Sequence, residues 1–338
     1  MSYNTVEYMD PMPLITGENW DKEIIGKVME TVYAGETHYV AVHGKAELRT
    51  LLSDFLESEG KTRSGDVHIT AGIQEARFLA IHFLGKTFGK TVLPEVVHPG
   101  VRQAIGVRKL DVGFIGFGTD ERLLVPVENI KKVGSDGAKV LYLESPSRLN
   151  GACYEGAEMD EIAGICKENG VTVILDIGLY PWLNTPCASL ANRSEMADSC
   201  LIIGEAWPGS GIDEAFVAYM GATADMVKKL AVQKQVLSIC TNAPSQNAAI
   251  AAAKIYRKKH ADILEEMGRV KAELSSSLKG LGAHILPCPL TNFVLCEADL
   301  SLQKKLESAD VQYIDSKYFG QQGFIQLPVL KAALNRLK

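Results

Sequence analysis

The stretch VTVILDIGLY, residues 171–180, decides the fold that this sequence predicts. Five apolar or β-branched residues lead into Asp176, and SCLIIGEAW at residues 199–207 is a second strand of the same kind. Strands that are apolar on both faces are typical of a mostly parallel sheet covered by helices on each side. The amphipathic segment EMDEIAGICKENG, residues 158–170, precedes the first strand and ends in a glycine that suits a helix C-terminus. This alternation predicts an α/β fold.

The same alternation continues outward from these strands. A strand entering a glycine turn is expected at residues 67–72, a helix at 73–88, and strands followed by loops within 91–100 and 138–147. Residues 214–221 predict a further strand, and apolar residues at helical spacing predict helices at 20–34 and 45–59. From about residue 244 a long helical stretch leads to short strand patterns at 284–298 and 322–329. These last elements predict a second, C-terminal α+β domain.

Composition and charge narrow the class of protein. The chain has 338 residues, 46% of them hydrophobic, and a formal charge of −6. This balance argues against a nucleic-acid-binding surface, and no apolar run approaches the roughly 20 residues that span a bilayer. The polar, acidic start MSYNTVEYMD does not resemble a signal peptide, so we expect a cytoplasmic protein. The seven cysteines form no CxxC pair, which favours reduced, buried thiols and no zinc site.

One glycine-rich stretch invites a different function. DVGFIGFGTD, residues 111–120, has glycines at 113, 116 and 118, which suggests a dinucleotide-binding motif. The spacing does not match G-x-G-x-x-G, and no helix pattern follows it. A strand and turn is the better interpretation, so an unrelated nucleotide-binding α/β protein is the weakest of the readings considered.

Ligands of open α/β sheets bind beyond the carboxyl ends of the strands. Three loops at such ends carry polar groups. The turn at residues 70–75 opens a helix, and its backbone N–H groups could hold a phosphate or another anion. Asp176 closes an apolar strand and needs a partner, which a protonated ring nitrogen or a structural hydrogen bond could supply. The loop SPSRLNG, residues 145–151, follows the strand VLYLE.

The order and spacing of these motifs resemble the class I and II aminotransferases, pyridoxal-phosphate enzymes of fold type I. HYVAVHGKAELR at 38–49 resembles Y-x-x-x-x-G-x-x-x-L-R, and PLITGENW at 13–20 resembles an N-terminal GEP stretch. ITAGIQEA at 69–76 resembles the cofactor phosphate loop, and LPEVVHPG at 93–100 resembles P-x-Y-P-G. LYLESPSRLNGACY at 141–154 resembles NPxNPTG, and VTVILDIGLY resembles D-E-x-Y.

The resemblance implies an architecture and a set of site residues. It implies a large domain with a mostly parallel seven-stranded sheet at 36–245, a small α+β domain from both termini at 1–35 and 246–338 with an N-terminal arm, and a homodimer. It places Asp176 opposite the pyridine nitrogen and His98 where an aromatic ring stacks on the cofactor. The implied cofactor-binding residues are Tyr39, Gly72, Ile73, Gln74, His98, Asp176 and Tyr180. The implied substrate-pocket positions are Gly17, Arg148, Glu205, Trp207, Asp213 and Gln326.

The same comparison exposes departures from the family pattern. Pro208 falls where the Schiff-base lysine belongs, and no lysine occurs between Lys167 and Lys228. Asp213 falls where an arginine binds the cofactor phosphate, and Gln326 where an arginine binds the substrate carboxylate. Arg148 replaces an asparagine, and Tyr180 comes one residue late. The missing lysine removes both the covalent anchor and the base that moves the proton at Cα.

Two functional hypotheses follow. In the first, the chain is a degenerate aminotransferase-like protein that forms no covalent link with pyridoxal phosphate, and its cleft serves another small ligand, an anion or a partner. In the second, it is an active pyridoxal-phosphate enzyme that uses a lysine from elsewhere, with Lys228, Lys229 and Lys234 as the nearest candidates downstream. The losses at four positions favour the first hypothesis.

Overall fold

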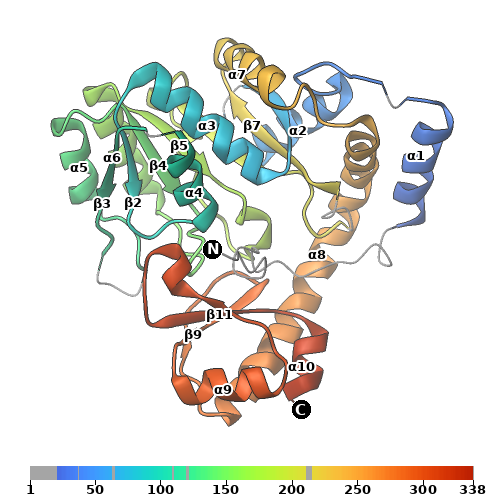
Figure 1. The fold of residues 1–338 in the computed structure, drawn as a ribbon, viewed down its shortest axis with the longest axis vertical. Helices are drawn as coiled ribbons and strands as arrows, with labels where there is room; N and C mark the ends of the chain where they lie inside the picture. The colour runs from blue at the N-terminus through green and yellow to red at the C-terminus, as the bar shows by residue number, and fades with distance from the viewer. Residues whose placement is uncertain are drawn as a thin grey trace.

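The computed structural model describes residues 21–36, 38–62, 65–108, 110–118, 122–210 and 215–337. A seven-stranded sheet forms the centre of the larger part of the chain (Figure 1). Its strand order is β1-β7-β6-β5-β4-β2-β3, and only β7 runs antiparallel to its neighbours. The strands are β1 (Asp66–Ala71), β2 (Thr91–Pro94), β3 (Val112–Ile115), β4 (Val140–Glu144), β5 (Thr172–Asp176), β6 (Cys200–Glu205) and β7 (Val217–Ala222). The predicted α/β fold with a mostly parallel seven-stranded sheet is confirmed.

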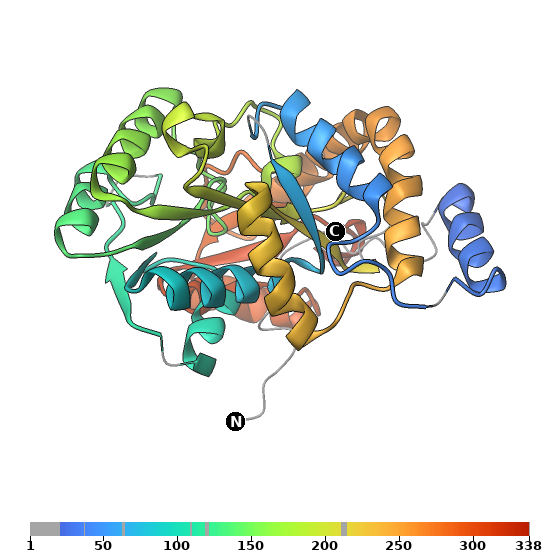
Figure 2. The same ribbon diagram turned by 90° about the horizontal axis from the view of Figure 1, so that it is seen from above.

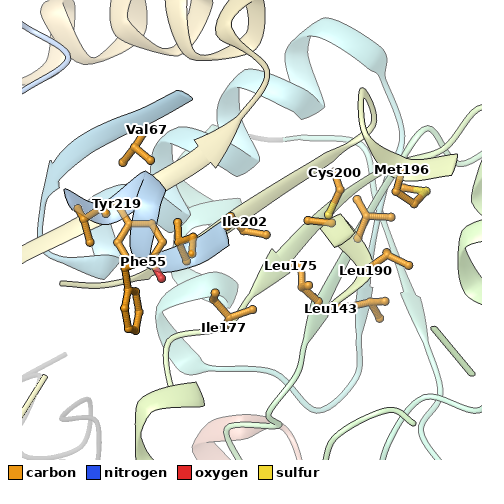
Figure 3. Close-up of a cluster of buried hydrophobic side chains, with 14 of the residues drawn as sticks. Phe55, Val67, Leu143, Leu175, Ile177, Leu190, Met196, Cys200, Ile202 and Tyr219 are labelled. Carbon is orange, nitrogen blue, oxygen red and sulfur yellow. The ribbon is translucent and has the colours of Figure 1, made fainter. Parts of the chain in front are cut away.

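Alternate residues of the sheet enter two separate cores. On β5, Val173 and Leu175 join the cluster on one face and Ile174 joins the cluster on the other, as the twofold repeat of a strand requires. One face is covered by α2 (Ala46–Ser58), α5 (Val127–Ser135) and α6 (Gly156–Asn169), and the other by α3 (Ile73–Phe88), α4 (Pro99–Arg108) and α7 (Ala224–Leu237). Figure 2 shows the sheet between these layers, and Figure 3 shows part of the first cluster around Leu175 and Ile202.

A single long helix, α8 (Ala243–Gly280), joins this body to a smaller one (Figure 1). Its first half packs in the core of the large sheet, and its second half packs in the cluster of the small domain. The small domain has an antiparallel sheet of order β10-β11-β9-β8. Its elements are β8 (Ile285–Leu286), β9 (Phe293–Glu297), α9 (Leu300–Ser308), β10 (Ile314–Asp315), β11 (Phe324–Pro328) and α10 (Lys331–Leu337). The division of the chain at residues 36 and 245 stays a prediction.

The sequence predicted most of these elements, and the exceptions have local causes. The helix at 73–88 agrees with α3 at both ends, and Gly170 caps α6 in the left-handed conformation. Helices α4, α5 and α9 were not predicted from the sequence, whereas the helical run expected around Lys228, Lys229 and Lys234 agrees with α7. The segment read as a loop after β2 already enters α4 at Pro99. The remaining elements are α1 (Lys22–Tyr33) and short 3₁₀ helices at Tyr180–Trp182, Leu190–Asn192, Ser194–Met196 and Ser316–Phe319. Across the described ranges, no helix combines the length and apolarity needed to span a bilayer.

The side chain of Trp182 ties the large domain to the small one and provides a test of this arrangement. The Trp182 side chain is fully buried in the small-domain cluster. The backbone carbonyl of Trp182 accepts hydrogen bonds from the backbone N and Oγ1 of Thr291 at 3.0 and 2.9 Å. We expect Trp182→Ala to lower the free energy of unfolding by about 3–5 kcal/mol, because the lost ring leaves a cavity. Urea unfolding followed by circular dichroism measures this. The exposed control Val236→Ala should stay within about 0.5 kcal/mol of the native chain.

Candidate functional site

Asp176 stands at the carboxyl end of β5, on the face of the sheet covered by α3. The twofold repeat that sends Ile174 to this face also sends Asp176 there, and register pairs Asp176 with Glu144 at the end of β4. Tyr142, two residues before Glu144, lies on the same face. The sheet thus places an aspartate, a glutamate and a tyrosine side by side, all of them buried.

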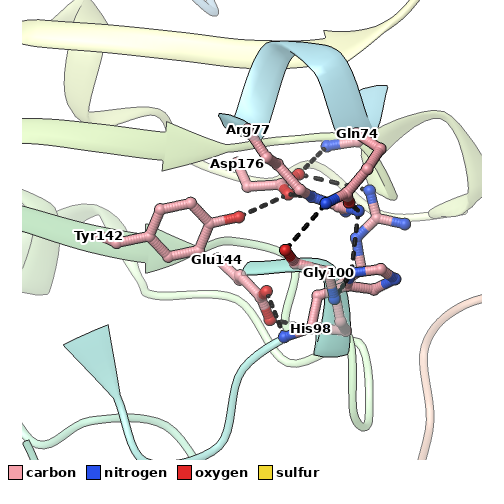
Figure 4. A network of polar contacts seen from close by, with 9 residues as sticks. Gln74, Arg77, His98, Gly100, Tyr142, Glu144 and Asp176 are labelled. Atoms are coloured by element: carbon pink, nitrogen blue, oxygen red, sulfur yellow. Dashed lines mark hydrogen bonds and ion pairs between the residues drawn. The ribbon is translucent and has the colours of Figure 1, made fainter. Parts of the chain in front are cut away.

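Four donors of the chain surround the Asp176 carboxylate, and Figure 4 labels two of them, Arg77 and Tyr142. Arg77 Nε, from α3, and the Tyr142 hydroxyl donate to Oδ2 at 2.9 and 2.8 Å. The backbone N of Gly178 donates to Oδ1 at 2.8 Å, and Arg148 Nη2 approaches the same oxygen at 3.4 Å. The side chains of Asp176 and of both arginines are each 1% exposed. The carboxylate is therefore neutralised by two buried guanidinium groups of the same chain.

These surroundings fix the charge states of Asp176 and Tyr142, whose side chains meet at Asp176 Oδ2. Burial alone would raise the pKa of Asp176, but Arg148, Arg77 and the hydrogen bonds of Gly178 and Tyr142 outweigh it and hold that pKa well below its ordinary value. Burial and the neighbouring Asp176 raise the pKa of Tyr142 well above its ordinary value. At neutral pH, Asp176 is an anion and Tyr142 is a neutral donor.

Glu144 carries a second buried carboxyl beside the first. It accepts hydrogen bonds from the backbone N of His98 at 2.9 Å and of Arg148 at 3.2 Å. Burial, followed by the negative charge of Asp176, raises the pKa of Glu144 to about 7, against the opposing effect of the His98 hydrogen bond. Glu144 therefore holds together the loops that follow β2 and β4.

His98 joins the same network through its ring nitrogen Nδ1. That atom accepts from the backbone N of Gly100 at 3.0 Å and faces Arg77 Nη1 at 3.0 Å, so the proton of the neutral ring sits on Nε2. The ring meets Phe319 edge to face, with centroids 6.2 Å apart. Gln74 closes the network by donating to the carbonyl of Gly100 at 2.8 Å. A stacking role for His98 stays a prediction.

The turn that opens α3 already contains a negative charge. Gly72 adopts φ +82°, a conformation that suits glycine. Glu75, the third residue of the helix, accepts from the backbone N of Ala71 at 2.6 Å and pairs with Lys234 Nζ at 2.6 Å. A carboxylate at a helix N-terminus occupies the place that favours an anion, and it repels a second one. Anion binding at this turn stays a prediction.

Two of the three downstream lysines considered as alternative amines, Lys229 and Lys234, form ion pairs on or beside α7, and the third, Lys228, is exposed. Lys234 is fully buried, and besides Glu75 its Nζ donates to Ser238 Oγ at 3.1 Å. Lys229 is more than half exposed and pairs with Asp225 at 2.7 Å, one turn earlier on α7. These contacts give neither amine a role in the Asp176 network.

The loop after β6 packs inward. Glu205 ends the strand half-buried, while Trp207 and Pro208 are buried. The ring of Trp207 packs against Phe55 and Tyr256, with centroids 4.9 and 5.6 Å away. Trp207 has φ +52°, a strained conformation for a bulky residue, and the packing of its ring offsets that strain. This loop belongs to the core between α2 and α8.

Gln326 connects the small domain to the network. It lies buried on β11, and its Nε2 donates to the carbonyls of Arg148 and Leu149 at 2.7 and 2.5 Å. It thereby holds the loop that positions the Arg148 guanidinium. Gly17 and Asp213, which were expected at the substrate pocket, lie outside the described residues.

The two tyrosines expected at the cofactor site have other surroundings. The hydroxyl of Tyr180 donates to Glu59, and Lys61 Nζ lies 3.7 Å from the centre of its ring. Tyr39 is 79% exposed, so its expected role would require another subunit. Both roles stay predictions.

Four residues that the sequence singled out meet in one network, namely Asp176, Arg148, His98 and Gln74. Sequence reasoning missed three of its members: Arg77, Tyr142 and Glu144. A signal for Arg77 was present, because an arginine in the apolar run ARFLAIHFL needs a buried anion. Tyr142 and Glu144 gave none, because the apolar strand VLYLE does not reveal which of its residues meet Asp176.

Comparison with known proteins supports the resemblance stated from the motifs. Residues 22–177, less than half of the chain, match the family model for aminotransferase class I and II. A probable aspartate/prephenate aminotransferase of Aquifex aeolicus is 25% identical over 147 residues, which cover 42% of this chain and 36% of the relative. A probable aminotransferase of Arabidopsis thaliana is 22% identical over 310 residues, covering 83% of this chain and 73% of the relative. The chain thus aligns with little more than a third of the first relative's length.

Solved structures extend the likeness in fold to nearly the whole chain. The N-succinyldiaminopimelate aminotransferase of Mycobacterium tuberculosis superposes with a TM-score of 0.86 at 18% identity, over 98% of this chain and 92% of that one. The aromatic aminotransferase of Pyrococcus horikoshii gives a TM-score of 0.81 at 18% identity, over 94% and 91%. The chain resembles the class I and II aminotransferases in sequence over residues 22–177 and has the fold type I architecture.

The raised pKa of Glu144 predicts a specific dependence of stability on pH. Between pH 4.5 and about 7 the folded chain keeps a proton on Glu144 that the unfolded chain releases, so this residue's contribution to stability falls as pH rises through that window. The change should be on the order of 3 kcal/mol. The variant Glu144→Gln should lose this slope in urea unfolding at pH 5, 6 and 7. A slope that persists in the variant, and equals that of the exposed control Glu57→Gln, would contradict the assignment.

Proposed function

We propose that this chain is a degenerate aminotransferase-like protein, which has the fold of the class I and II aminotransferases but does not carry out standard transamination. The single observation that supports this most is the pairing of Asp176 with Arg77 and Arg148. In the resembled family this aspartate would face the pyridine nitrogen of the cofactor. Here, side chains of the chain itself provide its positive partners.

The residues around Asp176 do not fit a pyridinium ring. A carboxylate offers about four lone-pair directions, and four donors of the chain already address them. The space beside the carboxylate is also filled, because a methyl group added at Gly178 would lie 2.1 Å from Arg148 Nη2. A cofactor nitrogen could approach Asp176 only by displacing a buried guanidinium, which would leave that charge without its anion.

Two further positions support the same proposal. The segment 168–227 contains no lysine, and Pro208, at the expected place, is buried in the core. Gln326, at the place expected for the substrate-carboxylate arginine, uses its amide to hold the backbone of the Arg148 loop. Because the Gln326 amide is uncharged and already hydrogen-bonded to this loop, it offers a substrate carboxylate no positive charge. We therefore derive no reaction step through pyridoxal phosphate, and we assign the cleft to another small ligand or to a partner.

We also propose that the protein is a homodimer of a reducing, cytoplasmic compartment. Four exposed apolar residues of α1 recur at helical spacing on one face: Ile25, Met29, Val32 and Tyr33. The opposite face carries the buried residues Ile24 and Thr31, and Thr31 Oγ1 accepts a hydrogen bond from Asn247 of the neighbouring helix α8. An apolar stripe of this kind favours a second protein surface over water. All seven cysteines are free thiols, which fits a reducing compartment.

The loss of cofactor chemistry can be tested directly with the full-length protein. After incubation with pyridoxal phosphate, borohydride reduction and dialysis, we expect a colourless protein with no pyridoxyl-lysine peptide. The reason is that Arg77 and Arg148 already pair with the carboxylate expected to hold the pyridine ring, and residues 168–227 contain no lysine. Mass spectrometry of tryptic peptides measures this. The variant Arg148→Asn, which frees one oxygen of Asp176, should bind the cofactor on the order of tenfold more tightly than the native chain.

A stoichiometric pyridoxyl adduct at one lysine of the native chain would overturn the proposal. Lys61, Lys228, Lys229 and Lys234 are the positions to inspect. Scattered, substoichiometric adducts that free lysine competes away would be surface reaction and would leave the proposal intact.

The dimer proposal has its own measurement. Light scattering of the native chain at micromolar concentration should give twice the chain mass of 36.7 kDa. The double variant Met29→Glu/Val32→Glu should shift the protein toward monomer, because burying two carboxylates in an apolar contact is costly. Val107→Glu, on an exposed site of α4, is the matched control and should leave the mass unchanged. A monomeric native chain would exclude the role expected for Tyr39.

A further inference from the structure

A second cluster of reactive side chains lies next to the Asp176 network but takes no part in it. It is formed by Lys61 from the connection between α2 and β1, Ser145 and Cys153 from the loop after β4, and Cys187 from the connection between β5 and β6. Cys187 also packs in the small-domain cluster, with Cys153 against its edge. The cluster therefore sits where the two domains meet.

Cys187 is surrounded by groups that can hydrogen-bond with its sulfur, and a lysine lies beside it. The Cys187 sulfur lies 3.6 Å from Ser145 Oγ and 3.6 Å from the carbonyl oxygen of Ala188, and the Cys153 thiol is among the groups that act on its pKa through a hydrogen bond. Lys61 Nζ donates to the carbonyl of Cys187 at 2.5 Å, which places a positive charge beside the same residue. The side chain of Lys61 is 3% exposed and rests against the ring of Tyr180. Burying a lysine against a thiol and a carbonyl is costly unless the thiol carries a negative charge.

The two thiols of the cluster have opposite properties. The hydrogen bonds of Cys153 and Ser145 and the charge of Lys61 lower the pKa of Cys187 to about 7, against the effect of burial. The hydrogen bond to Cys187, followed by burial, raises the pKa of Cys153 far above its ordinary value. Burial lowers the pKa of Lys61, and Glu59 acts on it in the opposite direction. Near neutral pH, one sulfur is a nucleophile and its neighbour remains a protonated thiol.

The chain contains an internal control for this pair. Cys166 on α6 and Cys200 on β6 are also neighbours, since the charge of one acts on the pKa of the other. Both are buried, and burial raises the pKa of each, that of Cys166 to about 12. No cation is among the groups that act on either thiol. These two cysteines therefore behave as small buried hydrophobic residues, whereas Cys153 and Cys187 have polar and charged neighbours.

We propose that Cys187 and Cys153 form a redox-active dithiol that reacts with hydroperoxides, with Lys61 and Ser145 positioning and stabilising the attacking thiolate. Cys187 Sγ attacks the distal oxygen of the hydroperoxide and breaks the O–O bond. This gives a sulfenic acid on Cys187 and an alkoxide or hydroxide, which takes a proton from solvent. Cys153 then attacks the sulfur of the sulfenic acid, and water leaves as the disulfide forms. The two cysteines are oxidised by two electrons, and the hydroperoxide is reduced to an alcohol or water.

The position of the bond gives this chemistry a structural consequence. The disulfide would link the loop after β4 to the connection after β5. These segments carry Arg148 and follow Asp176. Cys153 is half-buried, so part of this residue reaches solvent. The inference does not depend on whether the chain transaminates.

The test uses the reduced, full-length protein titrated with hydrogen peroxide. Digestion with trypsin and a glutamate-specific protease separates all four cysteines, because Glu155, Glu158 and Glu161 divide Cys153 from Cys166. We expect the 153–187 disulfide peptide to appear first and the 166–200 peptide to be absent. In Cys153→Ser, dimedone should trap a sulfenic acid on Cys187, and Cys187→Ser should give neither product. Equal formation of both disulfides, or neither at excess peroxide, overturns the proposal.

The role of Lys61 is tested by the rate at which iodoacetamide alkylates Cys187 as a function of pH. In the native chain the rate should titrate near pH 7, and Lys61→Gln should lower it at pH 7 on the order of tenfold because the thiolate fraction falls. Lys61→Arg keeps the charge and should restore most of the rate. Circular dichroism and thermal unfolding of each variant establish that it is folded. If Cys187 reacts no faster than Cys166 in the native chain, the thiolate assignment is wrong.

Discussion

The buried ion pairs of Asp176 with Arg77 and Arg148 are the interaction on which the rest of this site depends. They join α3, the end of β5 and the loop after β4, and each of the three side chains is almost completely buried. A buried ion pair contributes little net stability compared with apolar packing, but removal of one member leaves an uncompensated charge and costs about 3–5 kcal/mol. The arrangement therefore fixes geometry more than it adds stability. Tyr142, Glu144 and His98 take their positions from it, and Gln326 connects it to the small domain.

Much of the large domain could be predicted from the sequence because a parallel sheet requires strands that are apolar throughout. The segments at 171–176 and 199–205 meet that requirement, and α3 follows from its apolar run between two glycines. The direction of β7 could not be predicted, since a buried antiparallel strand has the same composition as a parallel one. Helices α5 and α9 have nine residues each, too short for a periodic pattern to stand out. Helix α4 begins with Pro99 and Gly100, which a sequence reading takes for a turn.

The candidate site was predicted only in part, because a sequence motif places a residue in the chain but does not give the direction of its side chain. Position in the chain placed Asp176, Arg148 and His98 near one another because the carboxyl ends of neighbouring parallel strands share one edge of the sheet. Motif comparison placed Arg148 in the substrate pocket, as a replacement for an asparagine, and could not tell that its guanidinium turns toward Asp176. Arg77 lies outside every motif, so its pairing with Asp176 became visible only in three dimensions.

A carboxylate at the end of a buried strand needs a positively charged partner. The source of that partner, a bound ligand or the chain itself, decides whether the stability of the site depends on a ligand. Where a bound ligand supplies the charge, the stability of the site rises and falls with ligand concentration. In this chain Arg77 and Arg148 supply it, so the carboxyl end of β5 is electrostatically complete without any ligand. The Asp176 carboxylate therefore needs no bound cation, while side chains on the surrounding loops can still take part in chemistry. The cluster of Lys61, Cys153 and Cys187 fits that division, because its thiols sit on the loop after β4, which carries Arg148, and on the connection after β5, which follows Asp176.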